Sequence, residues 1–168
     1  SFSASIDIDK RLFEVDIQGS IAYAEILKQA KLINAKELSK IKKGLKIILE
    51  EINQDKFDWD PALEDVHMNI EARLTKVSGS AAKKIHTGRA RNDQIATDLR
   101  LYLMEKIDDI SNLLISLQES ILYKAENHAG SIMPGLTHLQ IAQPVTFGHH
   151  LMAWFEMLSR DYSRLQDA

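Results

Sequence analysis

The chain has 168 residues, of which 45% are hydrophobic and 27% are charged, and its formal net charge is −3. This composition excludes disorder over most of the length, because enough apolar surface is present to offset the ordering entropy. The absence of cysteine excludes disulfides, thiolate metal sites and a cysteine nucleophile, and it fits a cytoplasmic, reducing location. The charge balance gives no global basic field for nucleic acid or acidic membranes.

The sequence contains neither a long apolar stretch nor a stretch rich in glycine or proline. No apolar run reaches the roughly 18 residues of a membrane span, and residues 1–5 lack the features of a signal peptide. Because the first residue is Ser1 and not Met, we interpret the chain as a processed or trimmed piece. With only 7 Gly and 3 Pro, the sequence predicts an all-α fold of few, long helices.

The first half of the chain predicts an extended arm over residues 1–8 and then three helices. The first runs over 9–32, with Gly19 as a weak point. The second follows Asn34, whose pairing with Glu37 is typical of a capping box. The third covers residues 62–78, after a break at 57–61.

The second half predicts a loop over residues 78–91, a fourth helix from 92 to 127, a loop over 130–143 and a fifth helix. Pro144 is expected in the first turn of that last helix. A helix of about 35 residues spans roughly 50 Å. A compact domain of this size has a diameter of only about 40 Å. The apolar stripe of the fourth helix should therefore be partly bare unless other chains, or further sequence, cover it.

The loop over 78–91 is the first candidate site, because it has four cations, His86 and no acidic residue. Arg89 and Arg91 suit forked contacts with carboxylate or phosphate, and the helix that starts at Asn92 favours anions at its N-terminus. The alternative is a solvated basic turn, in which Asn92 is a simple helix cap.

The second candidate is the stretch over 134–140. Thr137, His138 and Gln140 supply a hydroxyl, an imidazole and an amide within four residues. Histidine is the side chain best suited to proton exchange near neutral pH. The alternative is a structural histidine in a loop.

The third candidate is Glu64, His67 and Glu71, which share one face of a helix at i, i+3 and i+7. Carboxylate and imidazole at that spacing could bind a metal, but a di-metal site needs further carboxylates from other helices. We therefore expect no metal here, and favour an ion-paired helix start or a hydrogen-bonded wall of a site.

Two of these stretches resemble signatures of argininosuccinate lyase, a family of the fumarase/aspartase superfamily. The run HTGRARNDQ over 86–94 resembles the first signature, and PGLTHLQ over 134–140, followed by AQP, resembles the second. The arm over 2–6 and the stretch over 64–67 also resemble that family, in the same order. The resemblance covers essentially the whole chain.

The resemblance implies a cofactor-free enzyme that splits argininosuccinate into arginine and fumarate. It also implies a homotetramer built on a bundle of long helices, with each active site assembled from three subunits. His138 matches the catalytic acid/base histidine. The substrate-binding positions match Ser5, Asn92, Thr137, Arg91 and Arg89. A supporting role is expected for His67, His86 and Gln140.

The family's third signature, a Ser-Ser-x-Met-Pro-x-Lys loop that carries the serine usually assigned as the base, does not occur in this sequence. The expectation is therefore the front portion of a longer lyase, inactive by itself. Residues 1–85 would form an N-terminal helical domain and residues 86–168 the first part of the central bundle. The alternatives are a silent, crystallin-like relative, a sister lyase, and a helical anion- or RNA-binding module.

Overall fold

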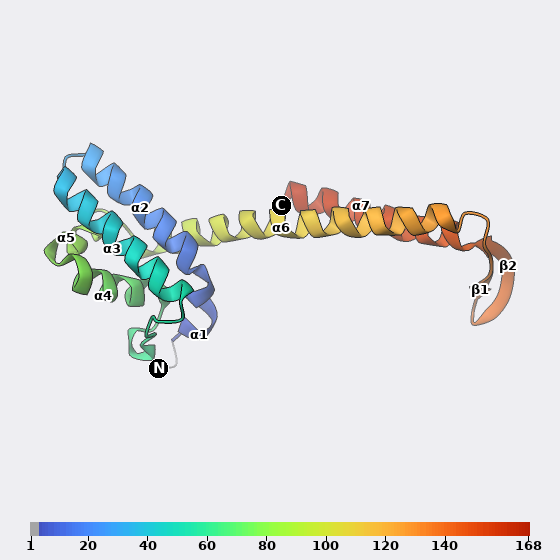
Figure 1. Ribbon diagram of the computed structural model, residues 1–168, viewed down its shortest axis with the longest axis horizontal. Coiled ribbons are helices and arrows are strands. Elements are labelled where there is room, and N and C mark those ends of the chain that lie inside the picture. The colour runs from blue at the N-terminus through green and yellow to red at the C-terminus, as the bar shows by residue number, and fades with distance from the viewer. Residues whose placement is uncertain (1–3) are drawn as a thin grey trace. The chain divides into compact units, whose positions relative to one another are not determined.

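The computed structural model describes residues 4–168, and helices make up most of it, which confirms the predicted fold class (Figure 1). The chain divides after Tyr102 into two compact units. The elements of the first unit are α1 (Ile6–Asp9), the 3-10 turn η1 (Lys10–Leu12), α2 (Phe13–Gln29), α3 (Ala35–Asn53), the 3-10 turn η2 (Pro61–Leu63), α4 (Val66–Ser78), α5 (Ser80–Lys83), the 3-10 turn η3 (Lys84–His86) and the beginning of α6 (Arg91–Asn127).

The first unit has its core where α2, α3 and α4 pack together. Helix α3 begins as predicted: the Asn34 side chain accepts hydrogen bonds from the backbone N–H groups of Lys36 and Glu37, and the Glu37 carboxylate accepts one from Asn34. The inward face of α3 carries Ile41, Leu45 and Ile48, which are fully buried. The predicted capping box of this helix is confirmed.

Two expectations for the first unit are wrong. Residues 6–9 are helical and not part of an extended arm, while residues 1–3 of that arm lie outside the described residues. The expected loop over 78–91 contains α5 and η3. Ala81, Ala82 and Ile85 explain this, because their burial against the core favours helical turns that satisfy the backbone.

The second unit consists of the remainder of α6, the strands β1 (Ile132–Thr137) and β2 (Gln140–Thr146), and α7 (Phe147–Asp167). Helix α7 runs back along α6, and the two strands form the connection between them (Figure 1). The Gln118 side chain on α6 donates to Ser159 Oγ on α7 at 2.7 Å. At Gly148, a Cβ atom would lie 2.9 Å from Cα of Ala129, so only glycine permits this close approach.

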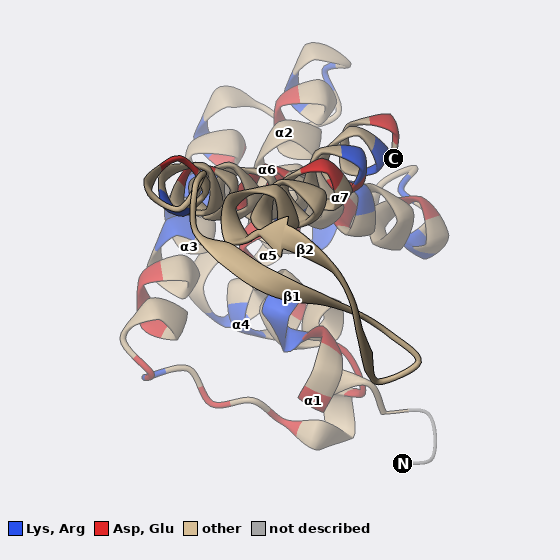
Figure 2. Cartoon of the chain, turned by 90° about the vertical axis from the view of Figure 1, so that its right-hand side faces the viewer, with Lys and Arg blue, Asp and Glu red and all other residues tan. Residues whose placement is uncertain are grey.

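The antiparallel pair β1–β2 corrects the expected loop over 130–143. Pro144 is also not in the first turn of a helix: it pairs with Pro134 in the hairpin, and Thr146 caps α7 instead. Proline is tolerated here because both strands of a two-stranded sheet are edge strands. The hairpin is uncharged throughout (Figure 2), as no Asp, Glu, Lys or Arg occurs between Glu126 and Glu156.

The bare apolar stripe predicted for the fourth helix is confirmed on the 37-residue helix α6. Most of its members are exposed in this chain, with Leu113 at 69%, whereas Ile121 is half-buried. The other exposed members are Leu99, Leu103, Ile110 and Leu117. No helix among residues 4–168 combines the length and the hydropathy needed to cross a membrane.

Candidate active site

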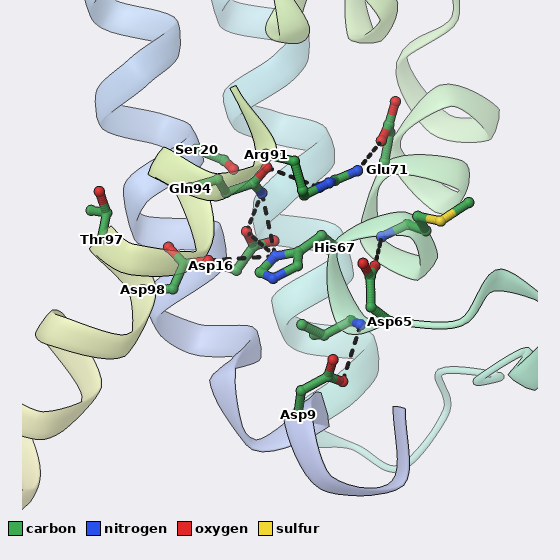
Figure 3. Close-up of polar contacts among 12 residues, drawn as sticks. Asp9, Asp16, Ser20, Asp65, His67, Glu71, Arg91, Gln94, Thr97 and Asp98 are labelled. Carbon is green, nitrogen blue, oxygen red and sulfur yellow. Dashed lines mark hydrogen bonds and ion pairs between the residues drawn. The ribbon is translucent and has the colours of Figure 1, made fainter. Parts of the chain in front are cut away.

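A buried polar cluster joins three helices of the first unit (Figure 3). We define it as Asp16 on α2, His67 on α4, and Gln94 and Asp98 on α6, all at most 4% exposed. His67 Nδ1 lies 2.9 Å from Asp16 Oδ1 and 3.4 Å from Asp98 Oδ2. The Gln94 amide nitrogen donates to the same Asp16 oxygen. One imidazole therefore lies between two carboxylates in the interior.

Asp98 is the unusual member of the buried polar cluster. Neither of its carboxylate oxygens has a hydrogen-bond partner among residues 4–168. Burial, together with the negative charge of Asp16, raises the pKa of Asp98 to about 7. Near neutral pH this side chain therefore exchanges a proton.

The pKa shifts of the other two titratable members favour their charged forms. Burial by itself would lower the pKa of His67, but the hydrogen bond to Asp16 and its charge outweigh burial, so this pKa is raised. Burial would likewise raise the pKa of Asp16, but its contacts with His67 and Gln94 hold it below the usual range. Asp16 and His67 thus form a buried ion pair next to Asp98.

Arg89 is the second positive group beside this cluster. Its guanidinium donates to Ser20 Oγ on α2 at 2.9 Å and lies 5.1 Å from the centre of the Tyr23 ring. Gly19 makes room for the arrangement, because a Cβ there would lie 3.3 Å from Asp98 Oδ1 and 3.8 Å from the Arg89 guanidinium. Gly19 has a low helix propensity, but its place in α2 is explained by this close packing.

Arg91 and His86 are held together by Glu71 on α4. Glu71 Oε2 lies 2.9 Å from His86 Nε2 and 3.2 Å from a terminal nitrogen of Arg91. The other terminal nitrogen of Arg91 donates to Gln94 Oε1 at 2.9 Å. Asn92 follows on the first turn of α6 and is exposed. The segment that lacks acidic residues in sequence thus receives its negative partners from neighbouring helices.

Ser5 lies near the start of α4. Its hydroxyl donates to Asp9 Oδ2 at 2.6 Å, and the other oxygen of Asp9 accepts the Val66 N–H at 3.2 Å. The Ser5 N–H donates to the Glu64 carbonyl at 2.9 Å. The Ser5 backbone is therefore fixed to the segment just before α4, and its side chain is linked to the first residue of α4 through Asp9.

Thr137, His138 and Gln140 lie at the exposed tip of the hairpin in the second unit. His138 and Leu139 form its two-residue turn with φ of 49° and 62°. This left-handed conformation suits glycine or asparagine and costs roughly 1–2 kcal/mol per ordinary residue. Such strain is found most often where a side chain has to be presented for function.

The shared helical face considered for Glu64, His67 and Glu71 does not form, because Glu64 precedes α4 with φ of 63° and Glu71 contacts His86 and Arg91. Another set, Asp16, His67 and Asp98, could offer one metal ligand each, with ligand atoms within 4.8 Å. Its two carboxylates already face two positive groups, the His67 imidazole and the Arg89 guanidinium. This balance favours an internal charge network.

Sequence reasoning missed Asp16 and Asp98 and gave Gln94 no role. A signal was present, since Asp16 lies between the apolar residues Val15 and Ile17 in a helix and Asp98 follows Gln94 by one helical turn. A surface groove of about 530 Å³ beside Phe57 and Trp59 contains none of the predicted site residues. The candidate chemistry therefore lies at the polar cluster, the segment 86–94 and the hairpin tip.

Comparison with known proteins gives one family over the whole length. The sequence pattern of a family described as Lyase matches residues 1–168. The argininosuccinate lyase of Methylococcus capsulatus is 58% identical over 167 residues, which cover 99% of this chain and 36% of that protein. The argininosuccinate lyase of Azotobacter vinelandii is 60% identical over 166 residues, again 99% and 36%. The chain thus spans about 36% of the length of these curated relatives.

Solved structures give the same fold. A variant of EDDS lyase with bound fumarate superposes with a TM-score of 0.80 at 29% identity, over 93% of this chain and 30% of that chain. A fumarate lyase:delta crystallin from Brucella melitensis superposes with a TM-score of 0.79 at 19% identity, over 98% and 42%, and this similarity concerns the fold alone.

Proposed function

Because this chain belongs to the lyase family, whose pattern covers residues 1–168, we propose that the full-length protein splits argininosuccinate into arginine and fumarate in the cytoplasm. The observation that carries the proposal is the segment 86–94, where Arg91 and Asn92 are presented at the N-terminus of a long helix. Guanidinium groups and helix N-termini both favour carboxylates. The 58% and 60% identity to argininosuccinate lyases supports this substrate.

The chemistry requires charge stabilisation and proton transfer. The base that the family resemblance assigns, the serine of the Ser-Ser-x-Met-Pro-x-Lys loop, takes the proton from the carbon next to a carboxylate. Negative charge then builds on that carboxylate, and fixed cations and N–H groups stabilise it. The carbon–nitrogen bond breaks with its electron pair going to the guanidino nitrogen of arginine, and that nitrogen takes a proton, which an imidazole supplies well near neutral pH. No step of this scheme uses a metal or a cofactor.

The residues take the following roles in the proposal. His138 is the acid/base group at the exposed hairpin tip. Substrate contacts come from Ser5, Arg91, Asn92 and Thr137. His67, His86 and Gln140 support the site. Arg89 faces Ser20 and the buried polar cluster, so we assign it an electrostatic contribution and Arg91 the direct contact.

We further propose a homotetramer whose active sites are shared between subunits. The exposed apolar stripe of α6 and the uncharged hairpin support it, since Leu136 is 62% and Leu139 93% exposed. Apolar patches of this kind mark interfaces between proteins. The solution mass of the full-length protein tests this assignment.

The experiment is a substrate panel with the purified full-length protein. Argininosuccinate should be cleaved to equimolar arginine and fumarate, with the highest kcat/KM among argininosuccinate, adenylosuccinate, aspartate and malate. Preference for another member of the panel would indicate a sister lyase. Turnover of none of them would indicate a silent relative, and salt-sensitive RNA binding would indicate the nucleic-acid module.

A further inference from the structure

Glu71 on α4 joins the two ends of the segment 86–91. Its Oε2 lies 2.9 Å from His86 Nε2 and 3.2 Å from a terminal nitrogen of Arg91 (Figure 3 shows the Arg91 contact). The three side chains are about one-third exposed, so this is neither a surface pair nor a fully buried one. The segment between the two contacts includes Gly88 with φ of 71°, in the left-handed region that glycine adopts without strain.

The Arg91 guanidinium is fixed from two sides. Glu71 on α4 holds one terminal nitrogen, and Gln94 on α6 accepts from the other at 2.9 Å. Gln94 is itself oriented, because its amide nitrogen donates to the buried Asp16. Since a guanidinium has five N–H donors in a rigid fork, the two described contacts leave donors for a carboxylate of a ligand.

We propose that Glu71 is a positioning residue for the lyase reaction: it holds Arg91, together with His86, so that the guanidinium meets a substrate carboxylate in one orientation. This inference rests on the proposed function. Glu71 does not itself face the substrate carboxylate, because like charges repel. It acts through Arg91, and fixing a rotamer-rich arginine before binding lowers the cost of ordering it later.

The alternative is that Glu71 only stabilises the fold. A control separates the two roles, because Glu51 on α3 also forms a Glu–Arg pair between helices of the first unit, with two hydrogen bonds from Arg73 on α4, away from the segment 86–94. Both pairs are partly exposed and tie neighbouring elements of the first unit. If Glu71 were merely structural, its removal and that of Glu51 would have similar consequences.

The test compares Glu71→Gln with Glu51→Gln in the full-length protein. Glu71→Gln should lower kcat/KM for argininosuccinate by about 10- to 100-fold, whereas Glu51→Gln should stay within about twofold at a similar loss of thermal stability. In the double variant with Arg91→Gln, the loss should equal that of Arg91→Gln alone, because Glu71 acts through Arg91. A merely structural role would instead give additive losses.

A second variant keeps the test decisive if Glu71→Gln unfolds. Glu71→Asp keeps the charge but withdraws it by one methylene, and it should fold and still slow turnover. Full turnover by either folded variant, or additive losses in the double variant, would overturn the inference. The proposed function would still stand in that case, provided that the unmodified protein releases fumarate. No cleavage of argininosuccinate by the unmodified protein would refute the proposed function, and the inference with it.

Discussion

At Asp98, a carboxylate lies in the interior without a hydrogen-bond partner among the described residues, with His67 Nδ1 3.4 Å from it and the Asp16 carboxylate close by. Such a group is costly to bury in its charged form. Protonation of Asp98 removes the charge and so reduces this cost, which is why burial raises its pKa to about 7. The positive charges of His67 and Arg89 limit the cost once that proton is lost.

Stability should therefore fall as pH rises through neutrality. The pKa of Asp98 is about 7 in the folded state, above its usual 3.8. Between these two pH values the folded state keeps a proton that the unfolded state has lost, so stability falls as pH rises across this range. The raised pKa of His67 acts in the same direction, from its usual 6.5 upward. The lowered pKa of Asp16 affects stability only at acidic pH, where stability is lost as the pH falls below about 3.8. Thermal unfolding of the full-length protein at about pH 5 and about pH 8 measures the effect.

Asp98→Asn identifies the group responsible. The amide cannot ionise, so the stability of the variant should fall much less as pH rises. At about pH 8 the variant should be more stable than the unmodified protein by more than about 1 kcal/mol. A variant whose pH profile parallels that of the unmodified protein would show that Asp98 is not the titrating group.

At the scale of elements, sequence patterns predicted helices better than the hairpin. The capping box at Asn34 is a local signal, and it is confirmed. The hairpin over 132–146 lacks the usual signals: its turn is His138-Leu139, not Asn-Gly, and each strand contains a proline. Its pattern therefore reads as a loop, although the paired residues are close in sequence.

Helix packing at Gly44 gives a prediction for α3 and α4. A Cβ there would lie 2.7 Å from Leu74 Cδ1 and closer still to Ser78 Oγ. Gly44→Ala should therefore destabilise by about 1–3 kcal/mol, although alanine favours an isolated helix by about 1 kcal/mol. Gly130→Ala is the control, since nothing lies within 4 Å of its Cβ position. Equal or higher unfolding temperature in Gly44→Ala would contradict the packing account.

The candidate site could be predicted only in part, and the reason is physical. Arg91, Asn92 and His138 were found from local motifs with chemistry in one stretch of sequence. The buried polar cluster was not, because it combines α2, α4 and α6, and such contacts depend on how helices pack. The roles of all these residues in catalysis stay predictions.

At the scale of the whole molecule, the chain covers about 36% of the argininosuccinate lyases it matches. Its sequence contains no Ser-Ser-x-Met-Pro-x-Lys stretch. The 168 residues by themselves should therefore release no fumarate from argininosuccinate, while the full-length protein should. Absorbance of fumarate in the ultraviolet follows both reactions, and release by the shorter chain would contradict the assigned need for that loop.

The central claim is that an imidazole at the hairpin tip moves a proton in a lyase reaction. It is tested most directly by kcat of His138→Asn in the full-length protein with argininosuccinate, beside His150→Asn, a change at another exposed histidine of the second unit. We predict that His138→Asn lowers kcat by about 10²- to 10⁴-fold while substrate binding stays measurable, and that His150→Asn turns over normally. Unchanged kcat in His138→Asn would contradict the account.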